Sequence, residues 1–242
     1  MRTVAVIVLA LAFAGSAGAQ TGKNLFGQFC AACHSVGPTR IGAGPGREMR
    51  QQDAAAPSLR GVGAMAADFY LSTGYMPLRK VGLEPRRSRK VLSPGEISEL
   101  TSYVASLGGG PAIPSPHPER GTLSEGMHLF SDHCAGCHQI VGEGGYANGA
   151  VPPPLEDASD VQIAEAVRIG PWVMPTFTKK AITDKQLDSI IRYVDYAKHP
   201  DDRGGWAIGH LGPIPEGLVT WFIGAVLLVA FCMSLGKRLK SS

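Results

Sequence analysis

Charged and aromatic side chains are both scarce in this chain. Of its 242 residues, 18% are charged and 7% are aromatic, and the formal net charge is only +3. This weak charge argues against a disordered acidic or basic chain and against a nucleic-acid-binding surface. The 31 glycines and 18 prolines together form about a fifth of the chain, and the apolar residues gather at its two ends. The composition therefore argues against one large hydrophobic core.

The N-terminal segment, residues 1–19, has the features of an export signal. Arg2 precedes an apolar stretch, and small residues at Ala17 and Ala19 form a cleavage site. We expect cleavage before Gln20, with an uncleaved membrane anchor as the alternative. Either outcome sends the following residues across the membrane.

The C-terminal segment predicts a membrane anchor. Gly217 to Leu235 is an uncharged and mostly apolar run, just long enough to cross a bilayer as a helix, which we place at residues 217–236. The basic tail, residues 237–242, is expected in the cytoplasm, so the body of the chain lies outside it. A buried helix of a soluble protein is the alternative. Cys232 within this run is expected to act as a small apolar residue.

The middle of the chain repeats itself. Each half closes with a helix that starts at a capping box, at Ser93 in the first half and at Thr183 in the second. We therefore expect an all-α fold with one domain at residues 20–107 and another at 123–200. A Gly/Pro linker at 108–122 joins them, and a juxtamembrane segment follows at 201–216. The paired motifs are Leu25-Phe26 with Leu129-Phe130, Pro57-Ser-Leu59 with Pro153-Pro-Leu155, and Met76-Pro77 with Met174-Pro175. The apolar stripes of the closing helices are Ile97, Leu100, Val104 and Leu107, and Leu187, Ile190, Ile191 and Val194.

Four of the five cysteines occur in two identical frames that end in histidine. These frames are Cys30-Ala-Ala-Cys33-His34 and Cys134-Ala-Gly-Cys137-His138. Two thiols one helical turn apart can add to the two vinyl groups of a porphyrin, and the adjacent histidine then ligates the iron. The frames therefore predict two covalently bound haem c groups. A zinc site, a redox-active dithiol and a short-range disulfide are the alternatives, and zinc would need more ligands than either half offers.

A methionine in each half is the candidate for the second axial ligand. Met76 and Met174 both precede proline and follow a glycine-bearing loop. His/Met ligation is typical of electron transfer, because a thioether favours ferrous iron. Filled coordination positions argue against a haem peroxidase. The rival ligands are Met65, Met127, His128 and His133, and the surface histidines are expected to be His117, His199 and His210.

The first half carries an additional basic loop between Met76 and Ser93. We weigh two interpretations, a solvated loop and a docking surface for an acidic partner or lipid headgroups. Its basic residues are Arg79, Lys80, Arg86, Arg87, Arg89 and Lys90.

On these motifs the chain resembles the dihaem cytochrome c subunit of the actinobacterial-type quinol–cytochrome c reductase, the cytochrome bc complex. The resemblance covers nearly the whole chain and is most specific at Thr73–Pro77, Arg168–Pro175 and Gly209–Gly217. It implies two tandem class I cytochrome c domains followed by one C-terminal transmembrane helix. Family members often keep an N-terminal membrane helix, whereas the N-terminus of this chain has a cleavable pattern.

The resemblance also implies a function and partners. Such a subunit takes electrons from a Rieske iron–sulfur protein beside a cytochrome b subunit and passes them to cytochrome c oxidase, with no catalytic residue of its own. Cys30, Cys33, His34 and Met76 would hold one haem, and Cys134, Cys137, His138 and Met174 the other. The alternative function is an electron carrier for a periplasmic dehydrogenase or another oxidase.

Overall fold

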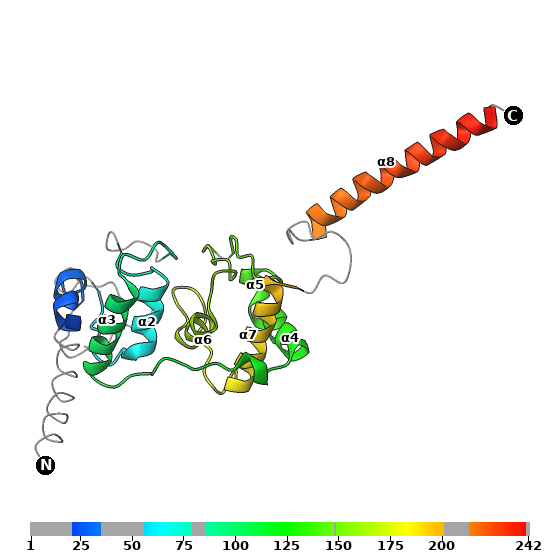
Figure 1. The fold of residues 1–242 in the computed structure, drawn as a ribbon. Coiled ribbons are helices and arrows are strands. Elements are labelled where there is room, and N and C mark those ends of the chain that lie inside the picture. Colours follow the sequence, from blue (N-terminus) through cyan, green and yellow to red (C-terminus); the bar gives the residue numbers. More distant parts are fainter. Residues whose placement is uncertain (1–20, 35–55, 79–85, 148, 201–212, 241–242) are drawn as a thin grey trace, which may run out of the picture. The chain divides into compact units, whose positions relative to one another are not determined.

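A computed structural model describes residues 21–34, 56–78, 86–147, 149–200 and 213–240 (Figure 1). The chain divides into two compact units, Met1–His199 and Pro200–Ser242, which are described separately. The described residues form helices and loops and contain no β-strand, which confirms the all-α prediction. The predicted export signal lies outside the described residues, as do His210 and most of the juxtamembrane segment.

The first unit contains a short helix at residues 21–29 and seven named elements. They are α2 (Gly63–Ser72), α3 (Pro94–Ser106), η1 (Pro118–Arg120), α4 (Leu123–His133), α5 (Ala135–His138), α6 (Asp160–Ile169) and α7 (Asp184–Lys198).

Capping residues explain where several of these helices begin. Ser93 and Thr183 form the two predicted capping boxes, and their side-chain oxygens accept hydrogen bonds from the third residue of α3 and α7. Ser159 forms a further capping box, with Gln162, at the start of α6. The predicted apolar stripes are buried, except that Leu107 caps α3 and is only half-buried.

We call residues 20–107 the first repeat and residues 123–200 the second repeat. In the first repeat, the helix at residues 21–29 packs against α3. A Cβ on Gly22 would collide with the backbone oxygen of Glu99, so only glycine permits this close approach. One turn later the ring of Phe26 lies 5.5 Å from that of Tyr103. A core cluster gathers beneath this crossing and contains Leu25, Phe26, Leu92, Ile97 and Leu100.

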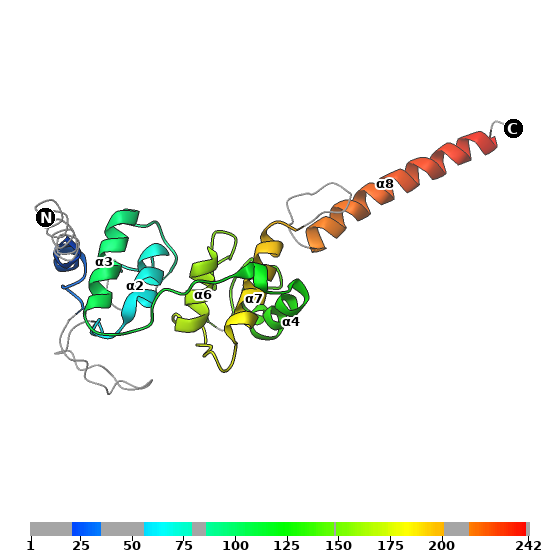
Figure 2. The same cartoon turned by 60° about the horizontal axis from the view of Figure 1, so that its bottom comes forward.

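The second repeat builds the same crossing from α4 and α7, which lie side by side in Figures 1 and 2. Gly126 takes the place of Gly22, and a Cβ there would collide with the backbone oxygen of Ser189. Phe130 lies 5.2 Å from Tyr193, which repeats the first aromatic pair. The larger core of this repeat includes Phe130, Ile163, Val167, Ile182, Ile190, Ile191 and Val194.

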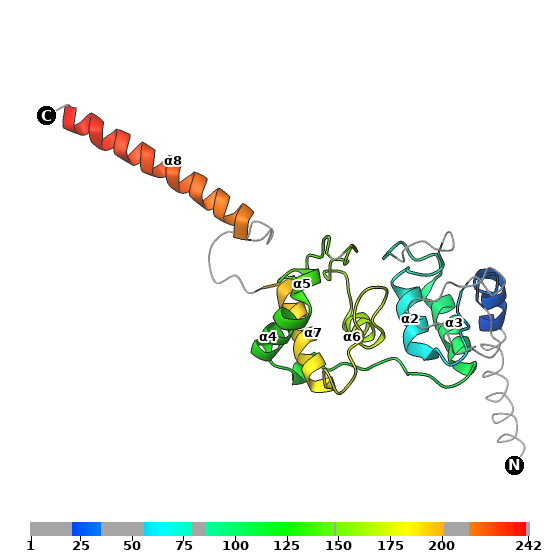
Figure 3. The same cartoon turned by 180° about the vertical axis from the view of Figure 1, so that it is seen from behind.

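The two repeats contact one another through α2 and α6 (Figure 3). The Gln162 amide nitrogen lies 3.1 Å from the Ser72 hydroxyl, to which it donates a hydrogen bond. The linker is held at both ends, because Met65 N donates to the carbonyl oxygen of Pro111 and His117 N donates to the Asp188 carboxylate.

The second unit consists of the described helix α8 (Pro213–Lys240). It begins four residues before the predicted start, at a proline, which fits the first turn of a helix. Within it, Gly217–Lys237 is long and apolar enough to cross a membrane, and none of that window is buried in the protein. The helix therefore has the character of a membrane anchor.

Candidate functional site

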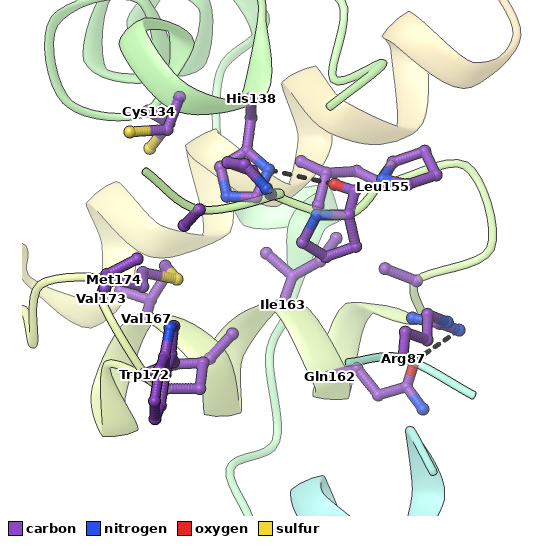
Figure 4. Close-up of a pocket in the computed structure, with 18 of the residues that line it drawn as sticks. Arg87, Cys134, His138, Leu155, Gln162, Ile163, Val167, Trp172, Val173 and Met174 are labelled. Atoms are coloured by element: carbon purple, nitrogen blue, oxygen red, sulfur yellow. Dashed lines mark hydrogen bonds between the residues drawn. The ribbon is translucent and has the colours of Figure 1, made fainter. Parts of the chain in front are cut away.

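A pocket opens in the second repeat between α5, α6, α7 and the loop that follows α6. Its wall is mainly apolar and includes Ile163, Val167, Ile190 and Val194. Cys134, Cys137, His138 and Met174 all line it, so the structure brings together the four site residues predicted for this repeat (Figure 4).

The Cys-x-x-Cys-His frame forms a tight helical turn at α5. Cys137 N and His138 N both donate to the carbonyl oxygen of Cys134, at 3.1 and 2.9 Å. Burial, followed by the charge of Cys137, raises the pKa of the Cys134 thiol to about 11. All five cysteines of the chain lie in the described part and none forms a disulfide. The described residues contain no group of three or more His, Cys, Asp and Glu side chains arranged for a metal ion.

In each Cys-x-x-Cys-His frame, one ring nitrogen of the histidine makes a hydrogen bond to a backbone carbonyl. His138 Nδ1 lies 3.2 Å from the carbonyl oxygen of Pro153. His34 makes the same contact in the first repeat, with Nδ1 2.8 Å from the carbonyl oxygen of Pro57. A carbonyl can only accept, so Nδ1 carries the proton and Nε2 keeps its lone pair for a metal. Burial lowers the pKa of His138, which also favours the neutral imidazole.

The carbonyl groups of Pro57 and Pro153 were not among the predicted site residues. Their signal in the sequence was the recurrence of a Pro-x-Leu motif, 23 residues after His34 and 15 residues after His138.

Met174 enters the pocket from a loop that begins at a left-handed residue. Gly170 ends α6 with φ +65°, and a Cβ there would collide with Thr176. Met174 N then donates to the carbonyl oxygen of Pro171 at 3.0 Å. These contacts fix the backbone that carries the thioether, and Figure 4 shows Met174 and His138 reaching the pocket from different elements.

Arg168 holds the far end of the same loop. Its Nη1 donates to the carbonyl oxygens of Phe177 and Ile182, at 3.1 and 2.7 Å, and its Nη2 lies 2.8 Å from the Asp184 carboxylate. Lys179 and Arg168 together lower the pKa of Asp184. The loop between α6 and α7 is therefore tied to both helices.

The predicted site residues of the first repeat lie on two different segments of the chain. Cys30, Cys33 and His34 follow the helix at residues 21–29, and Cys30 packs against the core. Met76 follows α2, where its N–H donates to the carbonyl oxygen of Tyr70 at 2.9 Å. Residues 35–55, which follow His34 in the chain, lie outside the described part.

The alternative candidates for the second axial ligand lie in different surroundings from Met174. Met65 is buried in α2, and Met127 is 55% exposed on α4. His128 pairs with Asp132 on the surface of α4. His133 lines the pocket, but its side chain is exposed and its ring packs edge-on against Phe177.

Arg87 of the basic loop contacts the second repeat. It lines the same pocket and is half-buried. Arg89 and Lys90 are exposed, and Arg79 and Lys80 lie outside the described residues.

Comparison with known proteins gives the family context. The model of the cbb3-type cytochrome c oxidase subunit III family matches residues 121–194. The chain is 33% identical over 229 residues to the cytochrome bc1 complex cytochrome c subunit of Mycobacterium tuberculosis (strain ATCC 25618 / H37Rv), covering 90% of this chain and 78% of that one. The same subunit of Corynebacterium diphtheriae is 31% identical over 237 residues, covering 90% and 80%. A cbb3-type cytochrome c oxidase subunit CcoP of Azospirillum sp. (strain B510) is 26% identical over 193 residues, covering 72% and 60%.

A helical fold around Cys-x-x-Cys-His turns, together with a family match to a cytochrome c domain, defines a c-type cytochrome, an electron carrier that holds haem c. The chain belongs to the family of the cytochrome c subunit of the cytochrome bc1 complex.

Proposed function

We propose that the chain holds two haem c groups and carries electrons within a quinol-oxidising cytochrome bc1 complex. Cys30 and Cys33 would form the thioethers of one haem, and Cys134 and Cys137 those of the other. When bound, haem iron accepts and releases single electrons. The observation that carries this proposal is the repeated histidine contact, in which a proline carbonyl orients both rings and leaves both Nε2 atoms for iron.

In the second repeat the residues present fit such a group. His138 and Met174 line one mainly apolar pocket, and Cys134 and Cys137 line it as well. The chain's own part is to hold the imidazole in one tautomer, to fix the thioether through Gly170 and Arg168, and to exclude water with the core side chains. His34 and Met76 would be the axial ligands of the first haem.

The proposal also specifies the direction of electron flow. The chain would receive electrons from a Rieske iron–sulfur protein beside cytochrome b and deliver them to a terminal cytochrome c oxidase. The names of the relatives support the bc1 complex. Helix α8 would anchor the chain with its haem domains outside the cytoplasm, because Lys237, Arg238 and Lys240 follow the apolar run.

Two measurements on the native membrane protein test this proposal. Haem analysis of the purified chain should give two covalent haems, falling to one when Cys134 and Cys137 are both replaced by serine. Gentle purification through a C-terminal tag should recover cytochrome b, a Rieske protein and oxidase subunits. A chain with one haem in the wild type, or one recovered without cytochrome b, would contradict it.

A carrier for another oxidase is the second candidate. The family match of residues 121–194 and the resemblance to CcoP favour it. Recovery of oxidase subunits in the absence of cytochrome b and a Rieske protein would support this candidate over the first.

A further inference from the structure

The pocket of the second repeat is completed by residues of the first repeat. Phe69, Thr73 and Tyr75 of α2 and its following turn contribute to the wall, and all three are buried. Arg87, from the basic loop of the first repeat, lines it as well. A haem in this pocket would therefore be enclosed by two parts of the chain that are far apart in sequence.

Hydrogen bonds hold Arg87 against the second repeat. Its Nη2 donates to the carbonyl oxygen of Asp157 at 2.7 Å and lies 3.4 Å from the amide oxygen of Gln162 (Figure 4). Gln162 is itself fixed by the Ser159 capping box and by its contact with Ser72. Both of Arg87's bonds come from Nη2, and a guanidinium has five N–H donors in a planar fork, so the same side chain can also bind a carboxylate.

We propose that Arg87 binds a carboxylate of the porphyrin held in the second-repeat pocket; this rests on the proposed haem site. In a c-type haem the thioether bonds and the two propionates leave opposite edges of the ring. Figure 4 shows Cys134 and Arg87 at opposite sides of the pocket. Attachment at the cysteines thus directs the propionate edge toward Arg87.

Charge supports the assignment. Arg87 is the one lysine or arginine among the described residues that line this pocket. A carboxylate against the surrounding apolar wall would be costly without a cationic partner. A positive charge beside the haem also disfavours the ferric state, which carries one more positive charge than the ferrous state. The first repeat therefore raises the reduction potential of the haem in the second.

The test is a spectroscopic redox titration of the full-length holoprotein. Met174→His identifies the midpoint of the second-repeat haem, because replacing the thioether by imidazole lowers it. Arg87→Gln should lower that same midpoint and leave the other unchanged, and Arg87→Lys should keep most of the wild-type value. Arg89→Gln, which removes an exposed charge from the same loop, should move neither midpoint.

Several results would overturn the inference. They are an unchanged second-repeat midpoint in Arg87→Gln, a shift confined to the first-repeat haem, or an equal shift in Arg89→Gln. Failure of the underlying proposal is separately visible, since a wild-type chain without haem on Cys134 and Cys137 would show one haem and one midpoint. That result would remove this inference together with the second haem.

Discussion

Glu165 of α6 faces Asp68 of α2 where the two repeats meet, and Glu165 is completely buried there. Burial, followed by the charge of Asp68, raises the pKa of Glu165 to about 8. Burial also raises the pKa of Asp68. The folded protein therefore keeps a proton on Glu165 at neutral pH, which an unfolded chain would release.

Stability should fall as the pH rises between the ordinary glutamate pKa of 4.5 and about 8. In that window the folded state binds the additional proton, so each rise in pH favours unfolding. Glu165→Gln should remove this slope and raise the melting temperature at pH 8. Thermal unfolding at several pH values measures both effects. Glu156→Gln, at an exposed glutamate, serves as the control, and a slope that persists in Glu165→Gln would contradict the assignment.

Gly126 lies where α4 crosses α7, and its replacement by alanine should destabilise the second repeat. The new methyl group would meet the backbone of Ser189, and overpacking of this kind costs about 1–3 kcal/mol. Gly27, in the helix at residues 21–29, has open space around its Cα, so Gly27→Ala should be neutral or gain up to about 1 kcal/mol. Denaturant unfolding compares the two variants. Equal stabilities of the two variants would show that α4 and α7 can shift to accommodate the new methyl group.

Most of the fold could be predicted from local sequence signals. The capping boxes at Ser93 and Thr183 and the apolar stripes after them predicted α3 and α7, because capping and periodicity are properties of neighbouring residues. The apolar run at Gly217 predicted the membrane helix in the same way. In the second repeat, the motif spacing also identified the residues that the pocket brings together.

Contacts between the repeats could not be predicted from these signals. In the sequence, Arg87 is one of several basic residues in a loop, and Glu165 belongs to none of the motifs identified there. Both acquire their surroundings only when α2 packs on α6, and no short-range pattern specifies that packing. The proline carbonyls that contact the histidines were missed for a related reason, because the recurring Pro-x-Leu motif does not reveal which group its backbone oxygen contacts.

Met174→Ala should open a coordination position in the second haem of the proposed site. The variant is expected to lose thioether ligation, to lower one midpoint potential, and to bind carbon monoxide in the ferrous state. Absorption spectra with and without carbon monoxide check this. Met127→Ala, at an exposed methionine of α4, should leave the spectra unchanged. Peroxide turnover by the wild type at the rate of Met174→Ala would instead favour a catalytic haem.

Arg168→Gln should loosen the loop that carries Met174. The change frees the carbonyl oxygens of Phe177 and Ile182, at a cost of about 1–3 kcal/mol. We expect thioether ligation to be lost at a lower temperature, followed through the weak long-wavelength absorption of thioether-ligated ferric haem. Lys179→Gln removes an exposed partner of the same Asp184 and should have little effect. Equal losses in both variants would point to Asp184 rather than to the carbonyl contacts.

The linker limits how far the repeats can separate. It is held at Pro111 on one side and at His117 on the other, and a fully extended chain between these residues spans about 20 Å at most. Each repeat thus meets the other at an effective concentration in about the millimolar range, regardless of how dilute the protein is. Even a weak affinity between α2 and α6 is then sufficient to keep them together, and electron exchange between the repeats becomes a first-order process.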